Sequence, residues 1–366
     1  MTIAFYTPTL SVGGYEKVVI NYANVFKNNH YVIILCGKAT GDLKKNIESG
    51  VQIVDFNTRM RGVFFALARW LKKNQCDILY VPFATFTSMA VIAKKISGSS
   101  VIIYSVQHGF ERNSHKILQY VMRKCVNKAE VLAAVSNTVA DYDSKRLNTD
   151  RGRYFVLNNP VFNSLEHVAV KCDCQVCDTL PRFVTCGRLA KDKHIEIPIR
   201  IIAELSKKRC VELIILGDGP EKENLEALIR ELNVQKQIRF VGFVSNPVLY
   251  MQHCVGYFQT SEIESFGNGV IDAMRCGVPS IVTECGGPIE IIEQGRYGIS
   301  IGKWDSCDVI ERGVAAAESI LDRTREFDSM DQKARLYDAA YLEKQFLEPY
   351  YEYIKKNKKA NNTNNS

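Results

Sequence analysis

The sequence predicts an α/β protein of two domains, each built on a parallel β-sheet. Three observations predict this class. The chain has 366 residues and is 46% hydrophobic, which is enough for two separate cores. Short apolar runs alternate with amphipathic segments in both halves, as they do in βαβ units. Between about residues 163 and 180 this pattern fades and polar residues collect, so we expect a hinge there.

The first domain, expected over residues 1–165, begins with a βαβ unit. Residues 3–6 form an expected strand, the loop 7–14 leads into a helix over 15–28, and residues 31–35 form a second strand. A helical crossover joins strands that run in the same direction, so the sheet should be parallel. Further strands are expected at residues 51–56, 77–81, 101–106 and 130–135, with helices between them.

The second domain, expected over residues 166–335, repeats this alternation. Its expected strands are 182–186, 211–216, 238–241, 255–258 and 280–283, and its expected helices are 197–207, 222–232 and 270–275. Two last helices are expected over 308–323 and 330–355. The polar tail 357–366 should be disordered.

A glycine-containing turn from Ser265 to Gly269 is the first candidate binding feature, because it opens the helix that starts near residue 270. The first amides of a helix lack internal partners and carry roughly half a positive charge, so they favour phosphate oxygens. Two carboxylates, Glu264 and Asp272, flank this turn. Carboxylates repel phosphate, so they are better suited to hydroxyl groups. A ligand with central phosphates and hydroxyl-rich groups on both sides is a nucleotide sugar.

This segment resembles the signature of family 4 of the retaining glycosyltransferases, of the bacterial surface-polysaccharide type. In that family one Glu holds the sugar hydroxyls and a second holds the ribose; Glu264 and the shorter Asp272 occupy these places here. The resemblance implies the GT-B architecture, in which two Rossmann-like domains face a central cleft. It also implies that the C-terminal helix, residues 336–356, crosses back to the first domain.

Two cations extend the resemblance. Gly187-Arg188-Leu189 is followed by Lys193, as in the family, although the family usually has Gly where this chain has His194. A nucleoside diphosphate gains negative charge as it leaves, and each charge-assisted hydrogen bond to it is worth about 1.5–3 kcal/mol. Arg188 and Lys193 would thus do what a metal does in many other sugar transferases. We expect no metal and no cofactor.

The remaining donor-site candidates lie in turns. The amides of Phe266, Gly267 and Asn268 would hold the diphosphate. The resemblance adds Gly13 and Gly14, which open the first helix, and the turns at Gly217 and Phe243, which would line the base and ribose. The sequence Gly217-Asp218-Gly219 lacks the third glycine of a dinucleotide fingerprint, which disfavours a dehydrogenase.

His108 is the candidate active-site residue of the first domain. It directly follows the strand 101–106, at the carboxyl end where doubly wound sheets bind ligands. Its position resembles that of the family's active-site His, near the transferred sugar and the acceptor, although an isolated His is often structural. Glu111 and Arg112 come next and could touch acceptor groups.

Charge differs between the halves. Residues 1–165 hold 21 Lys and Arg against 10 Asp and Glu, whereas residues 166–366 hold 26 against 30. The first domain should therefore face something anionic. Its expected helices 61–73 and 115–128 mix apolar and basic residues. They either cover the sheet with solvated charges or contact an anionic membrane surface. We expect no nucleic-acid partner.

The cysteines and the first residues of the sequence indicate in which compartment the protein is expected. Most of the twelve cysteines are scattered, as is typical of reduced thiols; Cys172, Cys174 and Cys177 could supply three zinc ligands but lack a fourth. No signal peptide and no run of 18 apolar residues is visible. A cytoplasmic protein is expected, either free or peripheral on the inner face of the plasma membrane.

The sequence therefore predicts a retaining glycosyltransferase. It would move a hexose or N-acetylhexosamine from a nucleoside-diphosphate sugar, expected to be UDP-linked, to a glycan or lipid-linked glycan in lipopolysaccharide or capsule biosynthesis. Two alternatives stay open: a non-catalytic subunit that binds nucleotide sugars, and an epimerase or phosphorylase of GT-B architecture.

Overall fold

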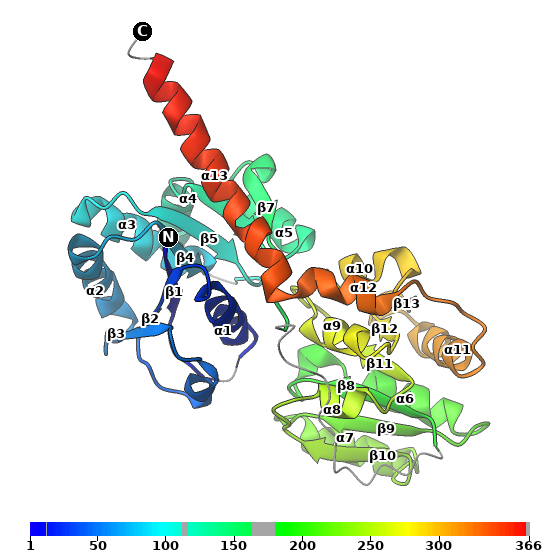
Figure 1. Cartoon of the computed structure of the whole chain (residues 1–366). Helices are drawn as coiled ribbons and strands as arrows, with labels where there is room; N and C mark the ends of the chain where they lie inside the picture. The colour runs from blue at the N-terminus through cyan, green and yellow to red at the C-terminus, as the bar shows by residue number, and fades with distance from the viewer. Residues whose placement is uncertain (12, 112–115, 163–179, 364–366) are drawn as a thin grey trace. The chain divides into compact units, whose positions relative to one another are not determined.

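The computed structural model describes residues 1–11, 13–111, 116–162 and 180–363, with side chains as far as residue 358. The chain divides into two compact units, shown in Figure 1. Unit 1 comprises Met1–Ser164 and Tyr337–Ser366, and unit 2 comprises Leu165–Leu336. The expected hinge and the three clustered cysteines fall almost wholly within residues 163–179, which lie outside the described residues.

Unit 1 is built on a seven-stranded parallel sheet with the strand order β3-β2-β1-β4-β5-β6-β7. Strands such as β4 and β5 are buried along their whole length, because a parallel sheet is covered on both faces. Its elements before the hinge are β1 (Thr2–Thr7), α1 (Gly14–Phe26), β2 (Tyr31–Cys36), η1 (Asp42–Asn46), β3 (Gln52–Asp55), α2 (Met60–Lys73), β4 (Ile78–Pro82), α3 (Phe83–Ser97), β5 (Ile102–Gln107), α4 (Lys116–Val126), β6 (Val131–Ala134), α5 (Asn137–Leu147), η2 (Arg151–Arg153) and β7 (Tyr154–Val156).

Unit 2 contains a six-stranded parallel sheet with the strand order β10-β9-β8-β11-β12-β13. The chain starts at the central strand β8, builds one side, and then crosses to β11 on the other side. The two parallel sheets expected from the sequence are thus confirmed. The elements of unit 2 are β8 (Arg182–Cys186), η3 (Lys191–Lys193), α6 (Glu196–Leu205), β9 (Glu212–Leu216), α7 (Lys222–Glu231), β10 (Ile238–Gly242), α8 (Val248–Met251), β11 (Gly256–Gln259), α9 (Asn268–Arg275), β12 (Ser280–Val282), α10 (Gly287–Ile292), η4 (Glu293–Gly295), β13 (Gly298–Ser300), α11 (Val309–Leu321) and α12 (Met330–Ala334).

The prediction of a single helix over 330–355 is wrong. The helix is interrupted between α12 and the last helix, α13 (Ala339–Thr363). A short turn, η5 (Arg335–Tyr337), leads into buried Asp338. The Asp338 Oδ1 accepts a hydrogen bond of 2.7 Å from the Ala340 amide, which caps a new helix. Asp338 also forms a backbone bridge with Phe162 of unit 1. The helix then runs to Thr363, so residues 357–363 are helical where disorder was expected; residues 364–366 lie outside the described residues.

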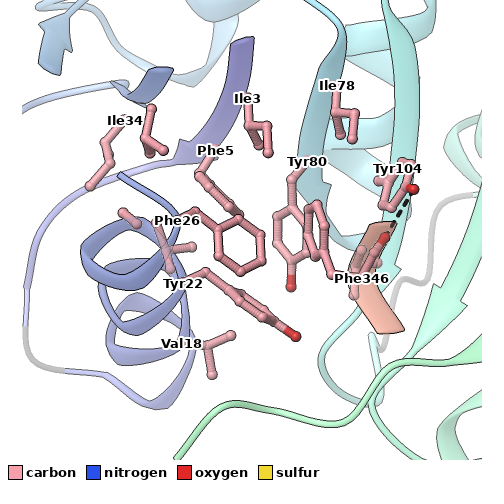
Figure 2. Close-up of a cluster of buried hydrophobic side chains, with 14 of the residues drawn as sticks. Ile3, Phe5, Val18, Tyr22, Phe26, Ile34, Ile78, Tyr80, Tyr104 and Phe346 are labelled. Carbon is pink, nitrogen blue, oxygen red and sulfur yellow. Dashed lines mark hydrogen bonds between the residues drawn. The ribbon is translucent and has the colours of Figure 1, made fainter. Parts of the chain in front are cut away.

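The C-terminal helix completes the core of unit 1, as expected from the resemblance. Phe346 on α13 is fully buried. Its ring centroid lies 5.0–5.9 Å from those of Phe5, Tyr22, Phe26, Tyr80 and Tyr104, as Figure 2 shows. The Tyr104 hydroxyl donates a 3.0 Å hydrogen bond to the Phe346 carbonyl. Residues from the two ends of the chain therefore share one aromatic cluster.

Candidate active site

The turns after β8 and β9 in unit 2 lie against each other and leave no room for side chains. A Cβ on Gly217 would lie 1.8 Å from the Gly187 carbonyl oxygen, and a Cβ on Gly219 would lie 2.4 Å from that of Leu189. Gly217 also has a positive φ of 144°. Glycine is therefore required at both positions, because only glycine lets the two turns approach this closely.

These turns continue in a row toward β10. The Gly187 amide donates to the Leu216 carbonyl at 2.9 Å, and the Gly217 amide donates to the Gly242 carbonyl at 2.8 Å. Phe243 follows Gly242 and its side chain is 65% exposed, although it is a large aromatic. The structure thus brings Gly217 next to the turn that carries Phe243, at the carboxyl ends of neighbouring strands.

The start of α9 is shaped by three glycines. Gly267 precedes the helix with a left-handed φ of 106°. A Cβ on Gly269 would lie 2.2 Å from the Tyr257 hydroxyl, and a Cβ on Gly287 would lie 2.4 Å from the Cα of Phe266. Phe266, Gly267 and Asn268 therefore form the helix start at which the sequence predicts the diphosphate.

Lys193 and Glu264, which are 71 residues apart, form an ion pair beside this helix start. Lys193 Nζ lies 2.9 Å from Glu264 Oε2, and the two side chains are 21% and 23% exposed. The Glu264 amide donates to the Cys285 carbonyl, and the Gly287 amide donates to the Glu264 carbonyl, so the backbone of Glu264 is fixed to the turn after β12. A cation and an anion are thus held together where β8, β11 and β12 end. The strand order reverses between β8 and β11, and open α/β sheets bind ligands at such a reversal.

Arg188 and Asp272 stand on either side of this pair in the sequence. The Arg188 side chain is 71% exposed, and its Nη2 lies 3.9 Å from the Asp192 carboxylate, so it is not committed to a close ion pair. Asp272 lies on α9, 3.8 Å from Arg275, and its side chain is 18% exposed.

Beneath these residues lies a polar chain that sequence reasoning missed. The buried Tyr257 hydroxyl donates to Gln259 Oε1 at 2.7 Å, and Gln259 Nε2 donates to Ser261 Oγ at 2.7 Å. Burial raises the pKa of Tyr257 well above its usual value, and the charges of Glu264 and Asp272 act in the same direction. Tyr257 and Gln259 alternate along buried β11, and Ser261 continues the same spacing two residues beyond it; this period of two was the available signal.

In unit 1, His108 follows β5 as expected but is only 8% exposed. Its Nε2 lies 2.6 Å from the Tyr80 hydroxyl, and the Tyr15 ring packs edge-on at 4.7 Å. Burial lowers the pKa of His108 to about 3, an effect that Asn159 partly offsets. His108 is therefore neutral near pH 7. Its imidazole can donate or accept a hydrogen bond, but it carries no extra proton to transfer at that pH.

The predicted phosphate contact at Gly13 and Gly14 lies at the start of α1, where a carboxylate already sits. Glu16 folds back so closely that a Cβ on Gly13 would lie 2.2 Å from Glu16 Oε2. Burial raises the pKa of Glu16. The negative end of this side chain occupies the helix start that an external anion would use, and the role of the two glycines stays a prediction.

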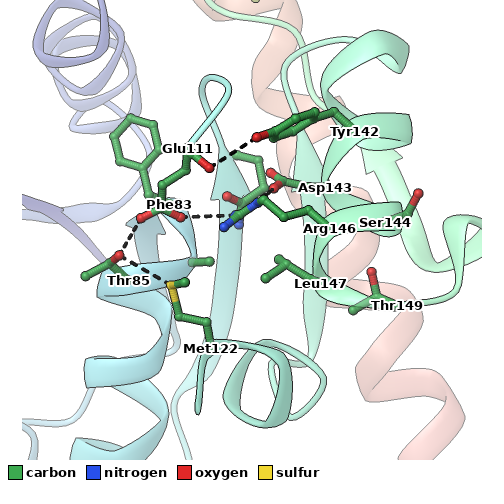
Figure 3. Close-up of polar contacts among 12 residues, drawn as sticks. Phe83, Thr85, Glu111, Met122, Tyr142, Asp143, Ser144, Arg146, Leu147 and Thr149 are labelled. Atoms are coloured by element: carbon green, nitrogen blue, oxygen red, sulfur yellow. Dashed lines mark hydrogen bonds and ion pairs between the residues drawn. The ribbon is translucent and has the colours of Figure 1, made fainter. Parts of the chain in front are cut away.

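Glu111, a candidate for acceptor contact, is bound within unit 1 (Figure 3). Its carboxylate accepts hydrogen bonds from Thr85 Oγ1 and, at 3.1 Å, from Arg146 Nη2; its carbonyl accepts one from Tyr142. Arg146 also pairs with buried Asp143, whose pKa burial raises to about 6 while Arg146 opposes the shift. Glu111 is thus tied to α3 and α5. Arg112, the other candidate, lies outside the described residues.

In the part of the chain that the structure describes, no group of three or more His, Cys, Asp or Glu residues could hold a metal ion. Among the described residues, the carboxyl edge of unit 2 brings together the Lys193–Glu264 ion pair and a glycine-lined helix start. Two units, each built on a parallel α/β sheet, are the architecture of the GT-B glycosyltransferases.

Comparison with known proteins gives the family. The profile described as "Glycosyltransferase Family 4" matches residues 12–162, and the profile described as "Glycosyl transferases group 1" matches residues 177–335. The chain belongs to family 4 of the retaining glycosyltransferases and is an enzyme that uses nucleotide sugars.

Individual relatives match over most of their length. N-acetyl-alpha-D-glucosaminyl L-malate synthase of Bacillus anthracis is 24% identical over 304 residues, covering 80% of this chain and 79% of the relative. Lipopolysaccharide 1,6-galactosyltransferase of Escherichia coli K12 is 25% identical over 313 residues, covering 81% and 84%. The crystal structure of HepE from Anabaena in complex with UDP-glucose superimposes with a TM-score of 0.76 at 18% identity, covering 96% of this chain and all of that one (100%).

Proposed function

We propose that this enzyme transfers a hexose or N-acetylhexosamine from a UDP-sugar to a glycan carried on a lipid, in cell-surface polysaccharide biosynthesis. The observation that carries the proposal is the Lys193–Glu264 pair of 2.9 Å beside the glycine-shaped start of α9. The UDP-glucose complex of HepE supports the donor class, and the lipopolysaccharide galactosyltransferase supports the acceptor class.

The donor-site roles follow from charge and position. Lys193, Arg188 and the amides of Phe266 to Asn268 hold the diphosphate, because the two side chains are cationic and the first amides of a helix carry partial positive charge. Glu264 accepts hydrogen bonds from the sugar, and Asp272 from the ribose. The turns at Gly217 and Phe243 line the base, where an exposed aromatic ring offers a stacking surface.

The reaction proceeds on one face of the sugar. The acceptor oxygen bonds to the anomeric carbon as the bond from that carbon to the outer phosphate breaks, and a phosphate oxygen takes the acceptor proton. Retention results because attack and departure share a face. The protein contributes position and positive charge rather than a covalent partner or a metal. His108 is neutral, so its role is to orient the reacting groups by hydrogen bonding and not to donate the proton.

A panel of UDP- and GDP-sugars tests the proposal. A ligand at a hundredfold excess over its dissociation constant stabilises the fold by about 2.7 kcal/mol, which a thermal-shift assay detects. We expect UDP-sugars to raise the melting temperature, and the best of them to be transferred to a lipid-linked glycan extract with retention. The absence of a shift with every UDP- and GDP-sugar would refute the donor assignment.

Glu264→Gln separates the sugar from the nucleotide in the same assay. A charged hydrogen bond is worth about 1.5–3 kcal/mol, so the variant should bind the UDP-sugar roughly 10- to 100-fold more weakly. Binding of UDP alone should change less than about threefold, since Gln still accepts a hydrogen bond from Lys193. Equal losses for both ligands would contradict the division of roles.

Two other functions make different predictions for that panel. A non-catalytic binding subunit would show the thermal shift but neither transfer nor slow hydrolysis of a labelled donor. An epimerase or phosphorylase would form product without an acceptor, or only with inorganic phosphate. The relative named N-acetyl-alpha-D-glucosaminyl L-malate synthase points to a small acceptor as a further possibility. If the acceptor is small, the glycan extract would give no transfer, but the thermal shift with the donor would be unchanged.

The acceptor class leads to a proposed contact with an anionic membrane surface through α4. No helix in the described part of the chain is long and apolar enough to cross a membrane. On α4, Ile117 is 83% exposed and Tyr120 is 61% exposed, whereas only Met122 and Val126 are buried. Lys116, Arg123 and Lys124 accompany them. A helix that merely covers the sheet would bury its apolar side chains; this one presents them beside cations, which matches an anionic lipid surface.

Replacing Ile117 and Tyr120 by Ser should release the protein from anionic vesicles. Each buried apolar side chain contributes about 1.5–3 kcal/mol, so we expect at least a tenfold loss in partitioning onto vesicles of mixed neutral and anionic phospholipid. Co-sedimentation measures it. Tyr341→Ser on α13, where the side chain is 60% exposed, is the matched control and should have little effect. The assignment would be contradicted if the Ile117 and Tyr120 double variant bound the vesicles as well as Tyr341→Ser does. It would also be contradicted if the wild-type protein showed no preference for anionic over neutral vesicles.

A further inference from the structure

The turn that directly follows Lys193 has an unusual backbone. His194 has a φ of +46° and lies in the left-handed region, which side chains other than Gly rarely adopt. The family resemblance places Gly at this position, so this chain carries a side chain where none is needed for the turn. Such a conformation persists only when its surroundings hold it.

Side-chain and backbone contacts hold the His194 side chain and the turn in place. The imidazole stacks on Trp304, with ring centroids 4.0 Å apart and planes within 14°. Its Nδ1 lies 2.7 Å from the Glu196 carboxylate at the start of α6. The Thr260 hydroxyl lies 3.0 Å from the His194 carbonyl and 3.3 Å from the Lys193 carbonyl, which ties the turn to the loop after β11.

Trp304, the other half of the stack, is itself held in place by packing. It follows β13 and packs against the hydrophobic core of unit 2. The turn is tied on its other side as well, since the Glu262 amide donates to the Asp192 carbonyl at 2.9 Å. The backbone of Lys193 thus lies between two anchored residues, and the direction of its side chain toward Glu264 depends on them.

We infer that the stack of His194 on Trp304 positions Lys193 for the outer phosphate of the donor. This inference rests on the proposed function, in which Lys193 binds that phosphate. His194 touches no reacting atom; it is a positioning residue that acts through the backbone of its neighbour. The aromatic pair fixes a turn that Gly would adopt without strain.

The test compares a nucleoside diphosphate with its monophosphate, because only the diphosphate has the outer phosphate. His194→Gly relaxes the backbone and removes the ring, and Trp304→Leu removes the other half of the stack. Each should weaken binding of UDP by about 3- to 10-fold, the worth of one aromatic pair, and leave UMP binding within about twofold. The double variant should lose no more than either single variant, and Trp304→Phe should retain most of the affinity.

Asn233→Gly is the matched control. Asn233 has a left-handed φ of +57° in the same unit, but it lies between α7 and β10, at the opposite edge of the sheet. Its replacement should leave the UDP to UMP ratio unchanged. Calorimetry measures the affinities, with GDP and GMP in parallel.

The outcomes are distinct. If the wild-type protein binds neither UDP nor GDP, the proposed function fails and the inference falls with it. If the wild-type protein binds and both variants keep its diphosphate to monophosphate ratio, the inference alone is overturned. Equal losses for diphosphate and monophosphate, together with a lower melting temperature, would show a purely structural role and also overturn it.

Discussion

Replacing Arg188 with Ala is expected to lower the turnover number by about 100- to 1000-fold, the usual loss when one stabiliser of developing charge is removed. The Arg188 guanidinium is 71% exposed and 3.9 Å from Asp192, so little opposes its movement onto a phosphate. The bond to the leaving diphosphate breaks in the transition state, and the interaction is strongest there. The Michaelis constant for the donor should change much less than the turnover number.

Arg209→Ala is the control for Arg188. Arg209 lies in the same unit, between α6 and β9, and pairs with Asp322 at 2.9 Å at the opposite edge of the sheet. Its loss should leave turnover within about twofold, since exposed ion pairs contribute little to stability. A loss of less than about threefold in folded Arg188→Ala would remove Arg188 from the site, because a charge stabiliser contributes far more than that.

Replacing Phe346 with Ala should lower the free energy of unfolding of unit 1 by about 3–5 kcal/mol. The side chain is fully buried among five aromatic rings, so its removal leaves a cavity in the cluster (Figure 2). Denaturant unfolding measures the total change. Hydrogen exchange shows which unit is destabilised. Amides of β1 and β4 in unit 1 should exchange faster in the variant, while those of β8 and β11 in unit 2 should not.

Tyr341→Ala provides the comparison for Phe346. Tyr341 lies on the same helix but is 60% exposed, so its loss should cost less than about 0.5 kcal/mol. A change below about 1 kcal/mol for Phe346→Ala would mean that α13 is not part of the core of unit 1, since large buried side chains cost several times that amount.

The sequence was sufficient for the features that local pattern determines. The expected strand 101–106 corresponds to β5 (Ile102–Gln107), and the expected helix 61–73 to α2 (Met60–Lys73), because apolar periodicity is a property of neighbouring residues. The glycine turn before α9 was equally readable. The closeness of Lys193 and Glu264 could be anticipated only from the family resemblance, since 71 residues separate them.

Other features depended on contacts that no local pattern records. The stack of His194 on Trp304 joins residues from opposite ends of unit 2. The break before α13 arises because Asp338 caps a helix and pairs with Phe162 of unit 1, so a continuous helical pattern was misleading. Charge balance indicated a basic first domain, but it could not tell that α4 leaves Ile117 exposed while α2 buries Leu67.

The aromatic cluster around Phe346 also bears on synthesis. Phe5 and Phe346 lie close together in the folded protein, yet 340 intervening residues leave the ribosome between them, including all of unit 2. Unit 2 can therefore collapse while the nascent first sheet still exposes its aromatic face to water. Until α13 emerges, the part of that face which Phe346 covers stays exposed, so we expect unit 1 to finish folding only after unit 2 has been synthesised.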